Sequence, residues 1–235
     1  MKKMLAMLLA LVMALSLTGG LAQTVTLAPE ELTTAPDAGG LRELRKSSSQ
    51  IRAAAFPETA DEVSIKDGVY TITTQGVTIT LELPFGWIGF TQDLKQQMVE
   101  YLQYFEDPRA LVEALVASSI NLLALEAGSD AQMMVFSEVN AASSLFMDLA
   151  DADMYEMALG MYQQSAGEGV DITGEVIGDM NFIRSLELGE GYEYVVYFTM
   201  IGGARIGFEL LPHGTEVTEA EEEILVDLIA ATTLT

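Results

Sequence analysis

The chain has 235 residues, a length that fits one ordinary domain together with a targeting segment. Acidic residues outnumber basic ones by 35 to 11, and the formal net charge of -24 argues against binding to nucleic acid or to an anionic membrane surface through a basic patch. The chain has no cysteine and a single histidine, His213, which excludes disulfides, thiolate metal sites and two-histidine metal motifs and argues against a Ser-His-Asp triad.

Residues 1–22 have the pattern of a secretory signal peptide. Lys2 and Lys3 form a positive region, an uncharged run rich in Leu, Met and Ala follows, and Gly20 and Ala22 supply small residues at a cleavage site. The apolar run, Met4–Leu17, has 14 residues, whereas a membrane-spanning helix needs about 20. We therefore expect a bacterial protein exported to the cell surface or the medium, with a retained N-terminal membrane anchor as the alternative.

Residues 23–66 are rich in Thr, Ala, Pro, Gly and Ser without a sustained helical or strand period, which is typical of a flexible linker. Residues 23–52 carry four acids and four bases, whereas residues 53–235 carry 31 acids and five bases, a net charge of -26. The bases between Arg42 and Arg52 can fold back on the acidic region or contact a wall polymer. A solvated short helix in a flexible tether is the favoured explanation.

A single domain is expected over residues 67–235, and it begins with two strands on either side of Gln75-Gly76. The second strand alternates apolar with polar residues, the period that buries one face of a sheet. Its apolar residues are Val77, Ile79, Leu81 and Leu83. Pro84 ends this strand, and Phe85-Gly86-Trp87 is predicted to form a turn before a helix capped by Thr91.

The helix after Thr91 is expected to place one apolar face inward, at Leu94, Met98, Tyr101, Leu102 and Phe105. Asp107-Pro108 provides a cap and a first-turn proline, which predicts a second helix, or one helix broken there. Its inward residues are Leu111, Val112 and Leu115. A hairpin follows, with strands over Leu122–Glu126 and Met133–Val139 joined by the turn residues Gly128-Ser129-Asp130.

Asp151 is predicted to cap a helix that ends at Gly167–Gly169. One apolar face of this helix carries Met154, Met157, Ala158 and Met161. Four strands separated by glycine-containing breaks are expected next, over residues 171–177, 180–188, 192–201 and 204–211. Thr218-Glu219-Ala220-Glu221 is a capping box that opens a closing helix, whose inward residues are Ala220, Ile224, Leu225, Leu228 and Ile229.

These elements give the order ββααββαββββα. Strands cluster in pairs instead of alternating with helices, which favours an α+β fold over a doubly wound parallel sheet. The short breaks between neighbouring strands require antiparallel hairpins. We therefore expect one antiparallel sheet of six to eight strands, flanked by helices on both faces.

The opening hairpin runs into Leu83-Pro84-Phe85-Gly86-Trp87 and a helix, and a long run of late strands ends in a helix behind Thr218-Glu219-Ala220-Glu221. This order resembles the PsbP/Mog-type superfamily, including its exported bacterial members, over most of residues 67–235. The resemblance implies an antiparallel sheet sandwiched by helices. It also implies a non-enzymatic role, since named relatives act as an extrinsic photosystem subunit or bind a small GTPase. No family site residue is carried over to this chain.

Two groups of residues are candidate binding sites. Phe85 and Trp87 can line a ligand slot, because exposed aromatic rings stack on other rings and on sugars, although a tryptophan at such a turn also packs beneath it. The second group can surround a calcium ion through its carboxylates: Asp148, Asp151, Asp153 and Glu156. Their spacing differs from that of an EF-hand loop, and a helix cap with solvated neighbours explains the same residues.

Three further groups of residues have both a functional and a structural interpretation. Glu175 and Glu187 lie on predicted strands and can face each other as an acid–base pair, although chance proximity is expected in so acidic a chain. An adaptable apolar surface can be formed by methionines, although their helical spacing is more typical of core: Met147, Met154, Met157 and Met161. Three tyrosines of one strand suit a protein interface where they are exposed: Tyr192, Tyr194 and Tyr197.

The sequence contains no catalytic motif, and we expect neither enzymatic activity nor a cofactor. The signal peptide, the linker, the lack of a catalytic motif and the PsbP/Mog-type order favour an exported, non-enzymatic domain. We expect it to work by contact with a protein partner at the cell surface or in the medium. A module that binds a small ligand or Ca²⁺ is the alternative. A hydrolase with two carboxylates ranks third, because it requires a cleft in which burial raises the pKa of one carboxyl.

Overall fold

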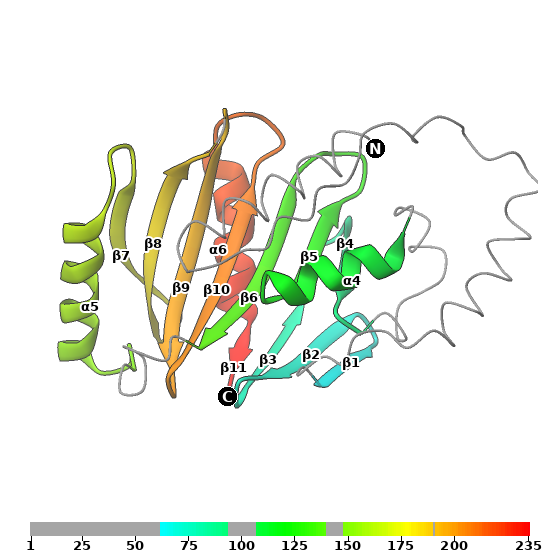
Figure 1. The fold of residues 1–235 in the computed structure, drawn as a ribbon, viewed down its shortest axis with the longest axis horizontal. Helices are drawn as coiled ribbons and strands as arrows, with labels where there is room; N and C mark the ends of the chain where they lie inside the picture. The colour runs from blue at the N-terminus through cyan, green and yellow to red at the C-terminus, as the bar shows by residue number, and fades with distance from the viewer. Residues whose placement is uncertain (1–61, 94–106, 140–147, 190) are drawn as a thin grey trace, which may run out of the picture.

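The computed structural model describes residues 62–93, 107–139, 148–189 and 191–235, and Figure 1 shows how their elements are arranged. These ranges form an α+β structure with antiparallel sheets, as predicted. The helices are α4 (Pro108–Ala117), α5 (Ala152–Ser165) and α6 (Glu219–Ala231). The strands are β1 (Glu62–Lys66), β2 (Val69–Thr74), β3 (Val77–Glu82), β4 (Trp87–Thr91), β5 (Ile120–Glu126), β6 (Gln132–Val139), β7 (Asp171–Ile177), β8 (Met180–Leu188), β9 (Glu193–Ile201), β10 (Ala204–Leu211) and β11 (Thr233–Leu234).

The described strands form two sheets, whereas the sequence predicts one. The large sheet has seven strands in the order β4-β5-β6-β10-β9-β8-β7, within the predicted six to eight. The small sheet has four strands in the order β1-β2-β3-β11. All the pairings in both sheets are antiparallel. The opening hairpin thus pairs with the short C-terminal strand β11 instead of joining the main sheet.

The two faces of the large sheet are covered by different elements. Residues of α4 and α5 pack on one face, whereas α6 and the small sheet pack on the opposite face (Figure 1). Helices therefore lie on both faces, as predicted, and the small sheet is an additional cover. The core beneath α6 contains the largest buried cluster, to which Ile79, Phe182, Phe208 and Leu225 belong.

The three described helices begin at the predicted caps. Asp107 accepts hydrogen bonds from two backbone N–H groups at the start of α4, and Asp151 does the same at the start of α5. Thr218 and Glu221 form the predicted capping box of α6. The predicted inward residues of α4, Leu111, Val112 and Leu115, are buried. On α6 only part of the predicted set is buried, namely Leu225, Leu228 and Ile229.

Two predicted boundaries are wrong. Glu62–Lys66 belong to the predicted linker but form β1, which pairs along its whole length with β2. Trp87–Thr91 are predicted as a turn and a helix cap but form β4, antiparallel to β5. Gly86 has a φ of 93°, and the Trp87 N–H donates to the Pro84 carbonyl at 3.1 Å. The turn is therefore complete before Trp87, and the chain enters the large sheet at once.

Four predictions fall on residues that the structure does not describe. These are the signal peptide at 1–22, the linker up to residue 61, the helix predicted to carry Leu94 to Phe105 and the part of the methionine surface assigned to Met147. Among the helices of the described ranges, none combines the length and apolar character that a membrane-spanning helix requires. Export and a retained anchor both remain predictions from the sequence.

Candidate functional site

Three alternate residues of β10, Arg205, Gly207 and Glu209, lie on the face of the large sheet that α4 and α5 cover. Gly207 pairs with Phe136 on β6 and with Phe198 on β9, and these two phenylalanines pack with α5 residues in one buried cluster. The Phe136 ring occupies the space above Gly207, where any side chain would collide with it. The glycine therefore makes room for aromatic rings between the two charged residues.

Glu209 is the most deeply buried carboxyl group among the described residues. It is 1 % exposed, and its Oε1 atom has no hydrogen-bond partner within the described ranges. Burial raises the pKa of Glu209 to about 8; the Glu187 carboxylate raises it as well, and the Arg205 guanidinium lowers it. Glu209 is therefore mostly a neutral acid at pH 7, because ionisation would leave a charge in an apolar environment.

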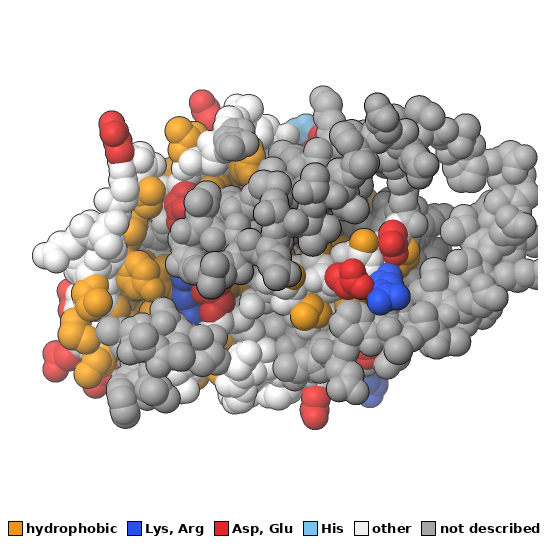
Figure 2. All heavy atoms as spheres, in the orientation of Figure 1, with side chains coloured by type: hydrophobic (Ala, Val, Ile, Leu, Met, Phe, Trp, Pro, Cys, Tyr) orange, Lys and Arg blue, Asp and Glu red, His pale blue; other side chains and the backbone are white. Residues whose placement is uncertain are grey.

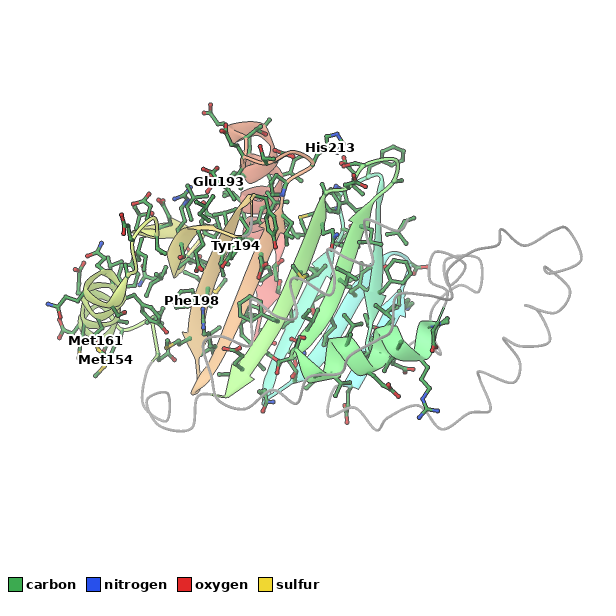
Figure 3. All side chains as sticks on the ribbon, turned by 45° about the horizontal axis from the view of Figure 1, so that its top comes forward. Met154, Met161, Glu193, Tyr194, Phe198 and His213 are labelled. Carbon is green, nitrogen blue, oxygen red and sulfur yellow. The ribbon has the colours of Figure 1, made fainter. Side chains whose placement is uncertain are left out.

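Glu187 lies closer to solvent than Glu209 and is bonded to two polar neighbours. Ser185 Oγ donates to Glu187 Oε1 at 2.9 Å, and the Tyr194 hydroxyl donates to Glu187 Oε2 at 2.6 Å. Tyr194 lies opposite Glu187 across the β8–β9 pairing and is labelled in Figure 3. Burial, followed by the hydrogen bond to Glu187, raises the pKa of Tyr194 well above its ordinary value. The phenol consequently stays protonated and keeps Glu187 in place.

Arg205 lies at the other end of the row that it forms on β10 with Gly207 and Glu209. Its guanidinium is 4.2 Å from the centroid of the Phe198 ring and 5.6 Å from that of Phe136, within the range of cation–π attraction. It also pairs with Glu138 on β6, with an N–O distance of 3.4 Å. Two aromatic rings and one carboxylate therefore hold its charge on the sheet.

The buried carboxyl cluster, defined as Ser185, Glu187, Tyr194 and Glu209, combines a neutral acid with a fixed carboxylate. Such a pair is the chemical requirement for acid–base catalysis. However, the carboxyl group with the raised pKa has almost no exposed surface where a substrate could meet it. We therefore assign the cluster a structural role.

The sequence analysis overlooked Glu209, although a signal was present. In the strand Ala204–Leu211 the charged residues Arg205 and Glu209 recur on one face of an otherwise apolar segment. A strand with neighbours on both sides must bury such side chains, which requires partners or a shifted pKa. The acid–base pair proposed from the sequence involved Glu187, but its electrostatic neighbour is Glu209.

Glu175 and Glu187 do not face each other. Glu175 pairs with Phe182 and Glu187 with Tyr194, so the two positions lie five residues apart along β8. At about 3.4 Å per residue this separation is about 17 Å. Glu175 instead accepts a hydrogen bond from Thr173 at 3.4 Å on its own strand. The prediction that Glu175 and Glu187 form an acid–base pair is therefore wrong.

The predicted ligand slot at Phe85 and Trp87 is not formed by two neighbouring rings. Phe85 is 106 % exposed at the β3–β4 turn, whereas Trp87 is half-buried and packs against the main core. Trp87 also pairs with Glu126 as the first residue of β4. The tryptophan thus has the packing role that the sequence analysis weighed as the alternative.

The four acids of the predicted calcium site lie at the start of α5. Asp148 accepts a hydrogen bond from the Ala150 N–H at 2.9 Å, and Asp151 caps the helix. Asp153 and Glu156 are exposed on the first turns of α5. Within the part of the chain that the structure describes, no three His, Cys, Asp or Glu side chains are arranged to hold a metal ion. The structure therefore gives these acids the roles of a cap and a solvated helix turn.

Three methionines form an apolar surface on α5. This surface, called the methionine face, is defined as Met154, Met157 and Met161. Met157 is 47 % exposed and Met161 is 54 % exposed, while Met154 is half-buried. Figure 3 labels Met154 and Met161, which lie on the same side of the helix. The prediction that these residues pack in the core is wrong for Met157 and Met161.

Tyrosine and leucine side chains occupy the inward face of α5 instead. Tyr155, Leu159 and Tyr162 pack with the cluster around Phe198, and the Tyr162 and Phe198 rings are 4.9 Å apart. Gly174 on β7 leaves the space that Tyr155 and Leu159 fill. The helix is therefore rotated by about one residue, or 100°, from the orientation predicted from its methionines.

The surroundings of the methionine face are acidic. Residues 110–183 contain no Lys, Arg or His and 12 Asp or Glu residues. In Figure 2 hydrophobic side chains gather over α5 at the left of the molecule; acidic side chains lie at the outer edge of this patch, and a basic side chain next to an acidic one lies at its inner edge. The nearest base in the following sequence, Arg184, pairs with Glu222 of α6 on the opposite face of the sheet. The methionine face is thus an apolar surface with exposed acids next to it at the start of α5.

Comparisons with known proteins give only weak structural likenesses. No protein-family model matches the chain, and no curated protein sequence is similar to it. A solved structure from Bacteroides thetaiotaomicron has a TM-score of 0.35 and 14 % identity, over 67 % of this chain and 45 % of its own length. Cyanobacterial PsbP from Synechocystis has a TM-score of 0.34 and 9 % identity, over 77 % of this chain and 97 % of its own length. The chain therefore spans less than half of the Bacteroides protein.

Proposed function

We propose that the chain is an exported, non-enzymatic domain that acts by protein–protein contact at the cell surface or in the medium. Its contact surface is the methionine face of α5. The observation that carries the proposal is the exposure of Met157 and Met161, at 47 % and 54 %, on a helix whose adjacent side is anchored in the core.

Methionine is well suited to a contact surface. Its unbranched, polarizable side chain adapts to differently shaped partners, and exposed methionines are frequent on surfaces that bind varied peptides. A contiguous apolar patch with a polar rim is a common mark of an interaction site. The rigid anchoring of α5 through Tyr155, Leu159 and Tyr162 supports the same interpretation, because a fixed helix loses little entropy on binding.

The remaining parts of the proposal come from the sequence. The signal peptide at residues 1–22 supports export, and the absence of a catalytic motif in the sequence supports a role without turnover. The net charge disfavours nucleic acid and anionic lipid as partners. We also propose membership in the PsbP/Mog-type superfamily, which rests on the order of the sequence elements.

Site-directed photo-crosslinking tests the contact surface. A photoreactive phenylalanine analogue replaces Met161 in the secreted protein in its own host. The matched control carries the same analogue at Phe85, an exposed aromatic residue next to β4, which is the edge of the large sheet opposite β7. We expect a discrete crosslinked protein from position 161 and none of that mass from position 85. Equal products from both positions, or none from 161, would contradict the proposal.

A further inference from the structure

We infer that the segment bound at the methionine face is a cationic amphipathic helix of the partner protein. This inference rests on the proposed contact surface and adds the chemistry of what occupies it. Three observations lead to it: the length of the methionine face, the exposed acids next to it and a hydrogen bond that already occupies one carbonyl of β7 beside it.

The dimensions of the methionine face fit a helix. Met154 and Met161 are seven residues apart, which corresponds to about 10.5 Å along the helix axis. Apolar residues at positions i, i+3 or i+4 and i+7 of a second helix span the same distance. Ridges formed by such side chains pack into the grooves between the residues of a facing helix.

The surrounding charges select a cationic partner. Asp151, Asp153 and Glu156 are exposed on the first turns of α5, and Asp153 lies one turn before Met157. Residues 110–183 contain no base, and Arg205, which lies on the same face of the sheet, is already paired with Glu138. Lysine or arginine residues that flank the apolar positions of a partner helix meet these carboxylates, which increases the association rate and excludes acidic competitors.

The same charges disfavour a second copy of this chain. A symmetric dimer through α5 would bring together two surfaces that both carry exposed acids, from two copies that are each strongly negative over residues 53–235, and like charges oppose association. They also disfavour an anionic lipid surface, which would be repelled in the same way.

At the edge of β7 next to α5, one backbone carbonyl is already bonded to a side chain of the helix. The side chain of Gln163 on α5 donates a hydrogen bond to the Ile172 carbonyl of β7 at 3.1 Å. An incoming strand would need this carbonyl as an acceptor, so strand addition has to break an existing contact. A helix on the methionine face leaves the contact intact.

Peptide binding to the mature secreted chain tests the inference. The probe is a synthetic helical peptide with leucines on one face and lysines on the other. One control has the same composition in scrambled order, and another has glutamates in place of the lysines. Isothermal titration calorimetry should detect binding of the ordered leucine–lysine peptide, with an affinity that falls as salt rises. Equal binding of the scrambled peptide, or of the glutamate peptide, would overturn the inference.

Variants locate the binding on α5. We expect Met157→Gln with Met161→Gln to weaken binding about tenfold or more, because the apolar contacts are lost. Asp153→Asn with Glu156→Gln should weaken it at low salt and reduce its salt dependence. Phe85→Gln, at a distant exposed aromatic residue, should change neither property. Equal effects of Phe85→Gln and the methionine variants would refute the assignment to α5.

Two other occupants give distinct results. If replacing Arg42, Arg45 and Lys46 by glutamine raises peptide affinity, the chain's own basic segment competes for the face, and a separate partner is ruled out. If sedimentation detects a dimer that Met161→Gln abolishes, the occupant is a second copy. If crosslinking from position 161 captures a protein while no cationic peptide binds, the inference fails and the proposed function stands.

Discussion

At the scale of single residues, Glu209 places a carboxyl group among apolar and aromatic neighbours on a central strand of the large sheet. Its pKa is raised to about 8 by burial, with a further contribution from Glu187. The glutamate therefore enters the fold as a neutral acid, which lowers the cost of burying it. It must still hold its proton at the pH where the protein works, and this makes folding sensitive to pH.

The raised pKa predicts that folding stability decreases with rising pH between the ordinary value of 4.5 and about 8. In this window the folded protein holds a proton at Glu209 that the unfolded chain has released, so the free energy of unfolding falls by at most about 1.4 kcal/mol per pH unit. Glu209→Gln replaces the neutral acid by an uncharged side chain of similar shape that does not titrate. This variant should therefore lose the dependence of stability on pH in this window. Urea unfolding at several pH values from about 5 to about 8 measures it.

The control for this experiment is Glu216→Gln, which changes an exposed glutamate in the loop before α6. This variant should keep the pH slope of the unmodified protein. Glu221 and Glu222 do not interfere, because their pKa values lie below the ordinary value and their effect is confined to acid pH. If Glu209→Gln keeps the full slope, Glu209 does not hold its proton in the folded state.

At the scale of elements, α6 is attached to the large sheet by a polar network as well as by apolar packing. Arg184 on β8 makes two hydrogen bonds to the Glu222 carboxylate, at 2.6 and 3.1 Å. The Tyr197 hydroxyl on β9 donates to the same carboxylate at 2.6 Å. Burial acts to raise the pKa of Glu222, but hydrogen bonds from Arg184 and Tyr197 outweigh it, and the pKa is lowered.

Removal of Glu222 should therefore loosen α6. Glu222→Ala leaves Arg184 and Tyr197 without their shared acceptor, and we expect a loss of about 1 to 3 kcal/mol in the free energy of unfolding at pH 7. Because the folded-state pKa of Glu222 is lowered, the contribution is present above 4.5 and is lost as pH falls through the lowered value. Denaturant unfolding at neutral and acid pH should reveal both effects. The exposed neighbour Glu223 provides the control, since Glu223→Ala should cost little at either pH.

Helix α5 offers a matched pair of glycine substitutions. A side chain at Gly174 on β7 would collide with Tyr155 and Leu159, whereas one at Gly160 on α5 has open space. Gly174→Ala should destabilise the fold by about 1 to 3 kcal/mol through overpacking. Gly160→Ala should stabilise it by about 0.5 to 1 kcal/mol, because alanine favours the helix. Thermal unfolding compares the two, and a stabilising Gly174→Ala would refute the packing of α5 on β7.

Local chemistry explains why the sequence predicted some elements and missed others. Asp107, Asp151 and Thr218 are identified as caps because their side chains bond to backbone groups a few residues away. The pairing of β3 with β11 depends on contacts between distant segments and leaves no local pattern. The rotation of α5 was missed because its methionines and its tyrosines can both pack in an apolar core, and the space that Gly174 leaves for Tyr155 and Leu159 decides which side faces inward.

At the scale of the whole molecule, the charge of residues 53–235 is -26. Repulsion among so many like charges opposes a compact state, and it is screened when salt shortens the Debye length from about 20 Å at 0.02 M to about 4 Å at 0.5 M. The melting temperature of the mature chain should therefore rise over this range. Differential scanning calorimetry at fixed pH measures it.

The same charge should act in the opposite direction on binding. Attraction between the acids near Met157 and a cationic helix weakens with salt, while the repulsion within the folded domain also weakens. One titration with sodium chloride should thus increase the stability of the free protein and decrease its affinity for the peptide. If both quantities rise together, apolar contact alone holds the peptide. If stability and affinity both fall, an ion of the salt binds at a specific site that the charge distribution does not explain.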